Sequence, residues 1–175
     1  MNAASLSGSS EAQPMPPFAR SLQLEDSYEK EFSICCLVTC WQEYSEVRAL
    51  FENMGFPPQH CEYLVCDNTE RNIFSAYEAV RVFMKSAKGR YVLIHHQDAF
   101  PAEHYDILIS RIRELEAGDP MWGVIGNAGA KDDRPFELIG SILTSGKQFQ
   151  LGQPFVRVAT LDENVMIVKL SLIHI

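Results

Sequence analysis

The sequence predicts a single α/β domain built on a mostly parallel β-sheet. Between residues 32 and 126, apolar runs alternate with segments of helical periodicity, in the order strand, helix, strand, helix, strand, helix, strand. The chain has 175 residues, which is enough for one ordinary domain with a sizeable core. In sheets of this kind the crossovers are right-handed, and ligands bind beyond the carboxyl ends of the strands.

The composition, 46% hydrophobic and 22% charged, lies in the globular range. The net charge of −8, without a long basic stretch, argues against non-specific nucleic-acid binding but leaves a nucleotide ligand open. No apolar run approaches the roughly 20 residues of a membrane-spanning helix, and the N-terminus lacks the pattern of a signal peptide. We therefore expect a cytoplasmic protein without a transmembrane segment.

The cysteines are odd in number and form no CxxC pair. We interpret them as reduced thiols of the core, with a zinc site as the weaker alternative. They are Cys35, Cys36, Cys40, Cys61 and Cys66.

Residues 1–30 are rich in Ser, Ala, Pro and Gln, and we expect a disordered leader there, because few large apolar groups can offset chain entropy. The predicted strands follow from continuous apolar runs, which are typical of strands covered on both faces. They span residues 32–40, 61–66, 90–95 and 122–126.

The first predicted helix spans residues 45–55, with Ser45 as its N-cap and Gly55 at its end. The second spans residues 72–89 and ends at Gly89; its apolar side includes Ile73 and Tyr77.

The third predicted helix spans residues 101–118, because Pro101 is a favoured helix opener and Gly118 can end it. After about residue 130 the pattern loosens into strand-like pieces broken by Gly and Pro. We interpret these pieces as antiparallel additions to the sheet.

Polar clusters follow three predicted strands, and they should meet at one end of the sheet. They are residues 39–43, residues 67–72 and the sequence HHQD at residues 95–98. His96 and Asp98 would point to the same side if the chain there were extended, and could together hold a divalent cation or a phosphate.

Each of these residues also has a plainer interpretation. Asp67 and Asp98 could be helix caps, since Asp98 stands shortly before Pro101. His95 continues the strand alternation and is expected to pack or bond locally. Surface positions are expected for His60, His104, Glu43 and Glu70.

From Phe32 to Gly129 the chain resembles the family 2 glycosyltransferases. ICCLVTCWQEYSEVRALFENM resembles the opening strand, turn and helix of that family, and EYLVCDNTERN resembles the strand that ends in its base-binding aspartate. NIFSAYEAVRVFMKSAKGRYVLIHHQDAF resembles the stretch that delivers the DxD motif, so that Asn72 opens the helix, Gly89 ends it, and His96-Gln97-Asp98 replaces DxD. The resemblance implies a Rossmann-like, three-layer GT-A sheet, mostly parallel, with a C-terminal antiparallel addition.

The resemblance also implies a hexosyltransferase-like, inverting enzyme. It would transfer a sugar from a nucleotide-diphosphosugar donor to a hydroxyl of an unknown glycan, lipid or protein acceptor. A divalent metal, Mn²⁺ or Mg²⁺, would be held by Asp98 and His96, although histidine here replaces the first aspartate of DxD. The donor nucleotide would be bound by Thr39, Cys40, Glu43, Asp67, Asn68, Asn72, His96 and Gln97.

By their order in the chain, Asp162 and Glu163 are candidates for the catalytic base. In the subset of the family that has an HQD ending, a further strand and an acidic helix would follow and supply the base. We therefore expect a C-terminally truncated glycosyltransferase-like domain at residues 31–169 and a non-native tail at residues 170–175.

Three alternatives stand beside this hypothesis. A nucleotidyltransferase on a similar sheet would need a Gly-rich basic loop after the first strand, and TCWQEYSE has neither Gly nor Lys. A second alternative is a catalytically inactive nucleotide-sugar-binding module of the same fold. The third is a structural domain whose polar strand ends are only caps.

Overall fold

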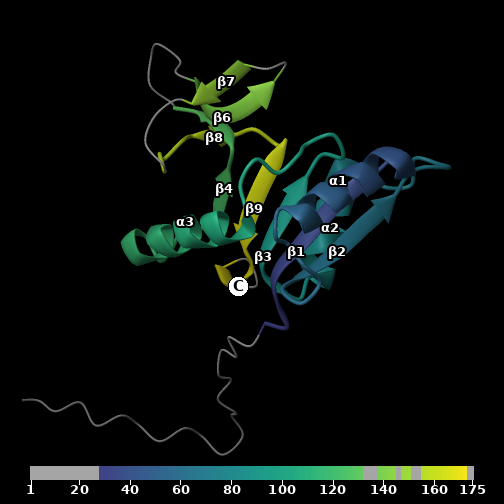
Figure 1. Cartoon of the computed structure of the whole chain (residues 1–175), viewed down its shortest axis with the longest axis horizontal. Coiled ribbons are helices and arrows are strands. Elements are labelled where there is room, and N and C mark those ends of the chain that lie inside the picture. The colour runs from purple at the N-terminus through teal and green to yellow at the C-terminus, as the bar shows by residue number, and fades with distance from the viewer. Residues whose placement is uncertain (1–27, 132–137, 145–146, 151–154, 173–175) are drawn as a thin grey trace, which may run out of the picture.

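The computed structural model describes residues 28–131, 138–144, 147–150 and 155–172, and it is a mixed α/β structure with a central five-stranded sheet (Figure 1). The strand order is β2-β1-β3-β9-β4. Strands β1, β2 and β3 are mutually parallel, whereas β9 runs antiparallel to both β3 and β4. Their bounds are β1 Lys30–Val38, β2 Cys61–Asp67, β3 Gly89–His95, β4 Val124–Gly126 and β9 Val165–Lys169.

The C-terminal strands divide between two sheets. The expected antiparallel addition is confirmed for β9, which lies between β3 and β4 and buries Ile167 and Val168. The other strands form a separate antiparallel sheet in the order β7-β6-β5-β8, so the expectation that all of them extend the main sheet was wrong. They are β5 Ala128–Ala130, β6 Leu138–Thr144, β7 Lys147–Gln150 and β8 Thr160–Leu161.

The helices cover both faces of the main sheet. α1 (Trp41–Asn53) and α3 (Tyr105–Gly118) pack on one face, in a core cluster with Phe32, Ile34 and Leu93. α2 (Ala76–Ser86) packs on the opposite face. There its buried side chains meet Cys35 and Val92, which alternate with the residues of the first cluster along β1 and β3.

α1 begins at Trp41, earlier than predicted, so Ser45 is not its N-cap. Ser45 lies inside the helix and donates a hydrogen bond from its Oγ to the carbonyl oxygen of Trp41 (2.7 Å). Cys40 occupies the N-cap position without a capping hydrogen bond from its own side chain.

α2 begins at Ala76, so the prediction that Asn72 opens the helix was wrong. Ser75 is the N-cap, and it forms a capping box with Glu78. This later start leaves Ile73 outside the helix and 60% exposed, and Tyr77 on its solvent side and 90% exposed.

Gly89 begins β3 and does not end α2, contrary to the prediction. A Cβ atom at this position would lie 2.4 Å from the backbone nitrogen of Ser33 on β1. The glycine is therefore required by the close approach of two strands.

α3 begins at Tyr105, so Pro101 does not open it. The chain from residue 96 to residue 104 leads from the end of β3 back to the end of α1, where the Tyr105 nitrogen donates to the Met54 carbonyl (2.9 Å). Asp98 therefore does not cap this helix.

All five cysteines are free, and four of them are buried, as expected for core thiols. Burial raises the pKa of Cys36 and of Cys61 to about 12, so neither thiol ionises near neutral pH.

No helix in the described part of the chain is long and apolar enough to cross a membrane. Residues 1–27 of the expected leader lie outside the described residues. Within the expected tail, Leu170–Leu172 form a 3₁₀ turn, and the Leu170 side chain is buried.

Candidate functional site

Three parallel strands and one turn meet at what we call the carboxyl end of the sheet. The register pairs Val38 of β1 with Asp67 of β2, and Cys36 of β1 with His95 of β3. β9 begins beside the end of β3, where the His96 nitrogen donates to the Asn164 carbonyl oxygen (3.1 Å). The structure thus brings the polar residues after β1, β2 and β3 together with the turn at residues 162–164.

Asp67 is exposed at the end of β2, and its Oδ1 accepts hydrogen bonds from the Thr69 hydroxyl (2.7 Å) and the Thr69 nitrogen (2.9 Å). These two bonds lower the pKa of Asp67, so its carboxylate is ionised at neutral pH. Because Ser75 caps α2, Asp67 is not a helix cap.

The Asn68 side chain shapes the β2–α2 loop. Its Oδ1 accepts from the nitrogens of Ile73 and Phe74 (both 2.9 Å), and its Nδ2 donates to the Asn72 Oδ1 (2.9 Å) and to the Phe74 carbonyl (2.8 Å). The predicted nucleotide-binding residues Asn68 and Asn72 therefore bind each other.

His96 and Asp98 are exposed, and they lie in a turn closed by a hydrogen bond from the Ala99 nitrogen to the His96 carbonyl (3.0 Å). The premise that extended chain places them on one side was therefore wrong. The Asp98 carboxylate lies near Cys36, whose pKa it raises, although burial is the larger cause.

The donor set of this turn is one carboxylate and one imidazole. Within the described ranges, no group of three or more His, Cys, Asp or Glu side chains could hold a metal ion. Two exposed ligands fit a Mn²⁺ or Mg²⁺ ion that takes its remaining ligands from phosphate and water. They do not fit a preformed structural metal site, which needs a fuller set of protein ligands.

Gln97, between these two residues, uses both ends of its amide inside the protein. Its Oε1 accepts from the nitrogens of Thr39 (2.8 Å) and Cys40 (3.2 Å), and its Nε2 donates to Glu43 Oε2 (2.6 Å). The sequence predicted that these four residues lie together, but it did not predict these bonds.

His95 is buried, with 3% of its surface exposed, and it packs on the Phe51 ring at a centroid distance of 5.0 Å. Its Nδ1 donates to the His96 carbonyl oxygen (2.7 Å). Burial lowers the pKa of His95 to about 4, so the ring is neutral at pH 7. The expectation that His95 packs and bonds locally is confirmed.

Asp162 and Glu163 are exposed in the turn before β9. Asp162 Oδ1 accepts from the Asn164 nitrogen (2.8 Å), and the Asp162 nitrogen donates to the Ala128 carbonyl (2.9 Å). This turn contacts the backbone of His96, so both carboxylates lie at the carboxyl end of the sheet.

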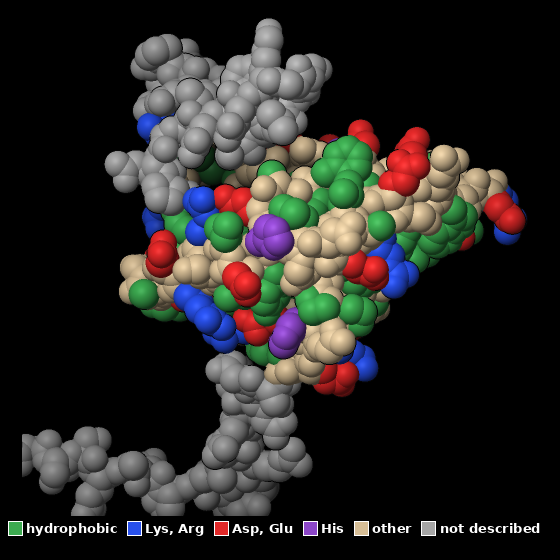
Figure 2. All heavy atoms as spheres, viewed as in Figure 1, with side chains coloured by type: hydrophobic (Ala, Val, Ile, Leu, Met, Phe, Trp, Pro, Cys, Tyr) green, Lys and Arg blue, Asp and Glu red, His purple; other side chains and the backbone are tan. Residues whose placement is uncertain are grey.

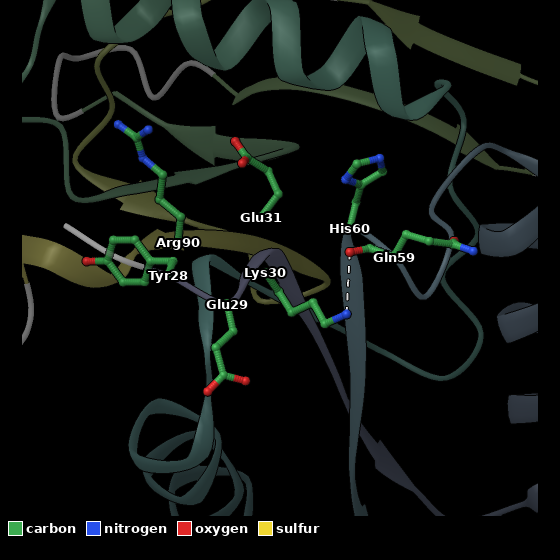
Figure 3. A pocket seen from close by; sticks show the side chains of 7 residues that line it. All are labelled: Tyr28, Glu29, Lys30, Glu31, Gln59, His60 and Arg90. Carbon is green, nitrogen blue, oxygen red and sulfur yellow. Dashed lines mark hydrogen bonds between the residues drawn. The ribbon is translucent and has the colours of Figure 1, made fainter.

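A hollow of about 270 Å³ lies at the other end of the sheet, at the start of β1 (Figure 3). Lys30 donates there to the Pro58 carbonyl (2.6 Å), and Arg90 pairs with Glu116 (3.3 Å). The lysine and the arginine that line the hollow therefore already have partners. We assign it no role in the site. Figure 2 shows acidic and basic side chains interspersed over the described face, without an extended basic surface.

No family profile matches the chain. The chain is 31% identical over 165 residues to a protein of Fuscovulum blasticum described as "ATP synthase subunits region ORF 6"; the match covers 89% of this chain and 65% of that protein. A crystal structure of 4-diphosphocytidyl-2C-methyl-D-erythritol synthase from Anaerococcus prevotii aligns with 83% of this chain and 74% of its own, at 8% identity and a TM-score of 0.38, which does not establish a shared fold.

Proposed function

We propose that the chain carries the donor site of a GT-A-type, inverting glycosyltransferase, which binds a nucleotide-diphosphosugar together with a divalent cation. One observation supports this most: the ends of β2 and β3 and the turn before β9 bring Asp67, Asp98 and Asp162 to one end of the sheet. Neither Asp67 nor Asp98 caps a helix, so the plainer interpretation of both carboxylates no longer applies.

Each carboxylate has a separate role in this proposal. Asp67 accepts a hydrogen bond from the base or ribose through its Oδ2, since both bonds with Thr69 go to its Oδ1. Asp98 holds the cation, and His96, which lies in the same turn, is proposed as a second ligand. The cation would offset the negative charge of the departing nucleoside diphosphate.

The reaction is a substitution at the anomeric carbon. The acceptor oxygen attacks this carbon while Asp162 or Glu163 takes the proton of the acceptor hydroxyl. The bond from the anomeric carbon to the diphosphate oxygen breaks, and the nucleoside diphosphate leaves with the electron pair. Attack from the opposite face inverts the configuration.

The nucleotidyltransferase alternative is less well supported. A triphosphate is usually held by backbone N–H groups and a lysine in the loop after the first strand. Here the loop has no lysine, and Gln97 occupies the N–H groups of Thr39 and Cys40. An inactive nucleotide-sugar-binding module has the same donor site, so only turnover separates it from the enzyme.

Isothermal titration calorimetry with UDP, GDP, CDP and dTDP, each with and without Mn²⁺, tests the proposed donor site. We expect at least one nucleoside diphosphate to bind, and to bind about tenfold or more tightly with Mn²⁺. Slow Mn²⁺-dependent hydrolysis of the matching nucleotide sugar would support the enzyme over the inactive module. Absence of binding to the whole panel in both conditions would contradict the proposal.

A further inference from the structure

The Gln97 amide joins two loops that are far apart in the sequence. Gln97 lies in the turn after β3, whereas Thr39, Cys40 and Glu43 belong to the β1–α1 turn and the first turn of α1. The bonded residues are 54 to 58 positions apart along the chain. Both loops contain residues of the proposed donor site.

The orientation of the amide is determined by Glu43. The group 2.6 Å from Glu43 Oε2 is the NH₂ of Gln97, which donates to this carboxylate oxygen. The carbonyl oxygen of Gln97 then faces the N–H groups of Thr39 and Cys40, which can only donate. Every contact of the amide therefore has a matching donor and acceptor.

The same contacts satisfy the N–H group of Cys40, the N-cap residue of α1, from outside the helix. Cys40, at the N-cap position, makes no capping bond with its side chain. N–H groups at the start of a helix attract anions such as phosphate. Here Gln97 Oε1 occupies the N–H groups just before α1, and the Glu43 carboxylate stands in its first turn and repels anions.

We propose that Gln97 and Glu43 are positioning residues that act as one unit, which we call the Gln97–Glu43 bridge. The bridge holds the turn of His96 and Asp98 against the start of α1 and keeps the N–H groups of Thr39 and Cys40 from the donor phosphates. In this arrangement the negative charge of the diphosphate is met at Asp98, through the cation. This inference rests on the proposed function and gives Gln97 a positioning role in place of the direct contact with the donor that the sequence predicted.

Three substitutions separate the contact of Gln97 with the two backbone N–H groups from its contact with Glu43. Gln97→Leu removes both contacts. Gln97→Glu keeps an acceptor for the two N–H groups but places a carboxylate against Glu43. Adding Glu43→Gln to Gln97→Glu restores a donor and an acceptor: the amide at position 43 then donates to the carboxylate at position 97. Gln42→Ala is the matched control, because Gln42 is exposed in the same helix turn and donates to Glu46 Oε1 (3.5 Å).

Hydrogen exchange of the Thr39 and Cys40 amides reports on the bridge without any ligand. We expect exchange about tenfold faster in Gln97→Leu and little changed in Gln97→Glu, which keeps the acceptor. The folding equilibrium constant should fall about tenfold in Gln97→Glu and recover when Glu43→Gln is added, although Glu43→Gln alone is nearly neutral. Unchanged exchange in Gln97→Leu, or no recovery in the double variant, would overturn the bridge.

The functional readout is the ratio of two affinities for the nucleoside diphosphate that binds among UDP, GDP, CDP and dTDP, one measured with Mn²⁺ and one without. A purely structural bond would lower stability but leave this ratio intact in the folded protein. We expect the ratio to fall about tenfold in Gln97→Leu, to recover in the exchanged double variant, and to stay unchanged in Gln42→Ala. An unchanged ratio in folded Gln97→Leu would overturn the positioning role. If the wild-type protein itself binds no nucleotide, the proposed function fails, and hydrogen exchange alone decides whether the bridge exists.

Discussion

The buried His95 predicts a specific dependence of stability on pH. Its pKa is about 4 in the folded protein against 6.5 for an unperturbed histidine, because burial disfavours the charged ring. Between these two values the unfolded chain binds a proton that the folded protein does not. Stability is therefore fully present above about pH 6.5 and is lost as the pH falls toward 4.

The size of this effect follows from the two pKa values. Complete loss of the contribution of His95 lowers the unfolding free energy by about 3 kcal/mol, and about 2 kcal/mol of this is lost between pH 7 and pH 5. His95→Leu places an apolar side chain against Phe51 and removes the titrating group. Between pH 7 and pH 5 the unfolding free energy of this variant should therefore fall by about 2 kcal/mol less than that of the wild-type protein.

Urea unfolding at pH 7 and pH 5 measures this difference. Carboxylates titrate equally in both proteins, so subtracting the two profiles isolates His95. The exposed His104 supplies the control, and His104→Gln should follow the wild-type profile. If His95→Leu and the wild-type protein lose equal stability between pH 7 and pH 5, the neutral, buried state of His95 is refuted.

Three further predictions concern other residues. Asp67→Ala should weaken binding of the matching nucleoside diphosphate about tenfold or more in calorimetry, and an unchanged affinity would leave Asp67 only its bonds to Thr69. Alkylation of the native protein followed by mass spectrometry should label the buried thiols such as Cys36 slowly and Cys40 first; rapid labelling of all the thiols would defeat the interpretation of a thiol core. Gly89→Ala should destabilise the fold by about 2 kcal/mol or more, measured by thermal unfolding, because a Cβ there meets the β1 backbone at 2.4 Å; a neutral effect would show that the strands can separate.

The parallel strands could be predicted because each is a continuous apolar run, and β1, β2, β3 and β4 all lie within or near the predicted ranges. The position of β9 between β3 and β4 could not be predicted. An apolar segment such as VMIVK is compatible with several neighbours, and the choice depends on pairing over long sequence separations.

The helix starts were missed for local reasons. The sequence SAYE carries the capping-box signal of α2, with Ser75 followed by Glu78 at the third position after it. The resemblance placed the start at Asn72 instead. For α3 the Pro101 signal was misleading, because the chain first returns to the end of α1 before Tyr105 starts the helix.

Much of the candidate site followed from topology alone. Polar residues after parallel strands must share one end of the sheet, and this brought Asp67 and Asp98 together correctly. The internal bonds of Gln97 could not be predicted, since a side-chain amide that binds backbone groups 58 residues away leaves no pattern in the sequence.

The proposed donor site depends above all on Asp98 holding a cation against the diphosphate of the donor. The most direct measurement is the titration of the matching nucleoside diphosphate, with and without Mn²⁺, into the wild-type protein and Asp98→Asn. Asp106→Asn is the control, because Asp106 is an exposed carboxylate in the first turn of α3. We expect Mn²⁺ to tighten nucleotide binding about tenfold or more in the wild-type protein and in Asp106→Asn, and not in folded Asp98→Asn. Equal tightening by Mn²⁺ in all three proteins would show that Asp98 does not hold the cation.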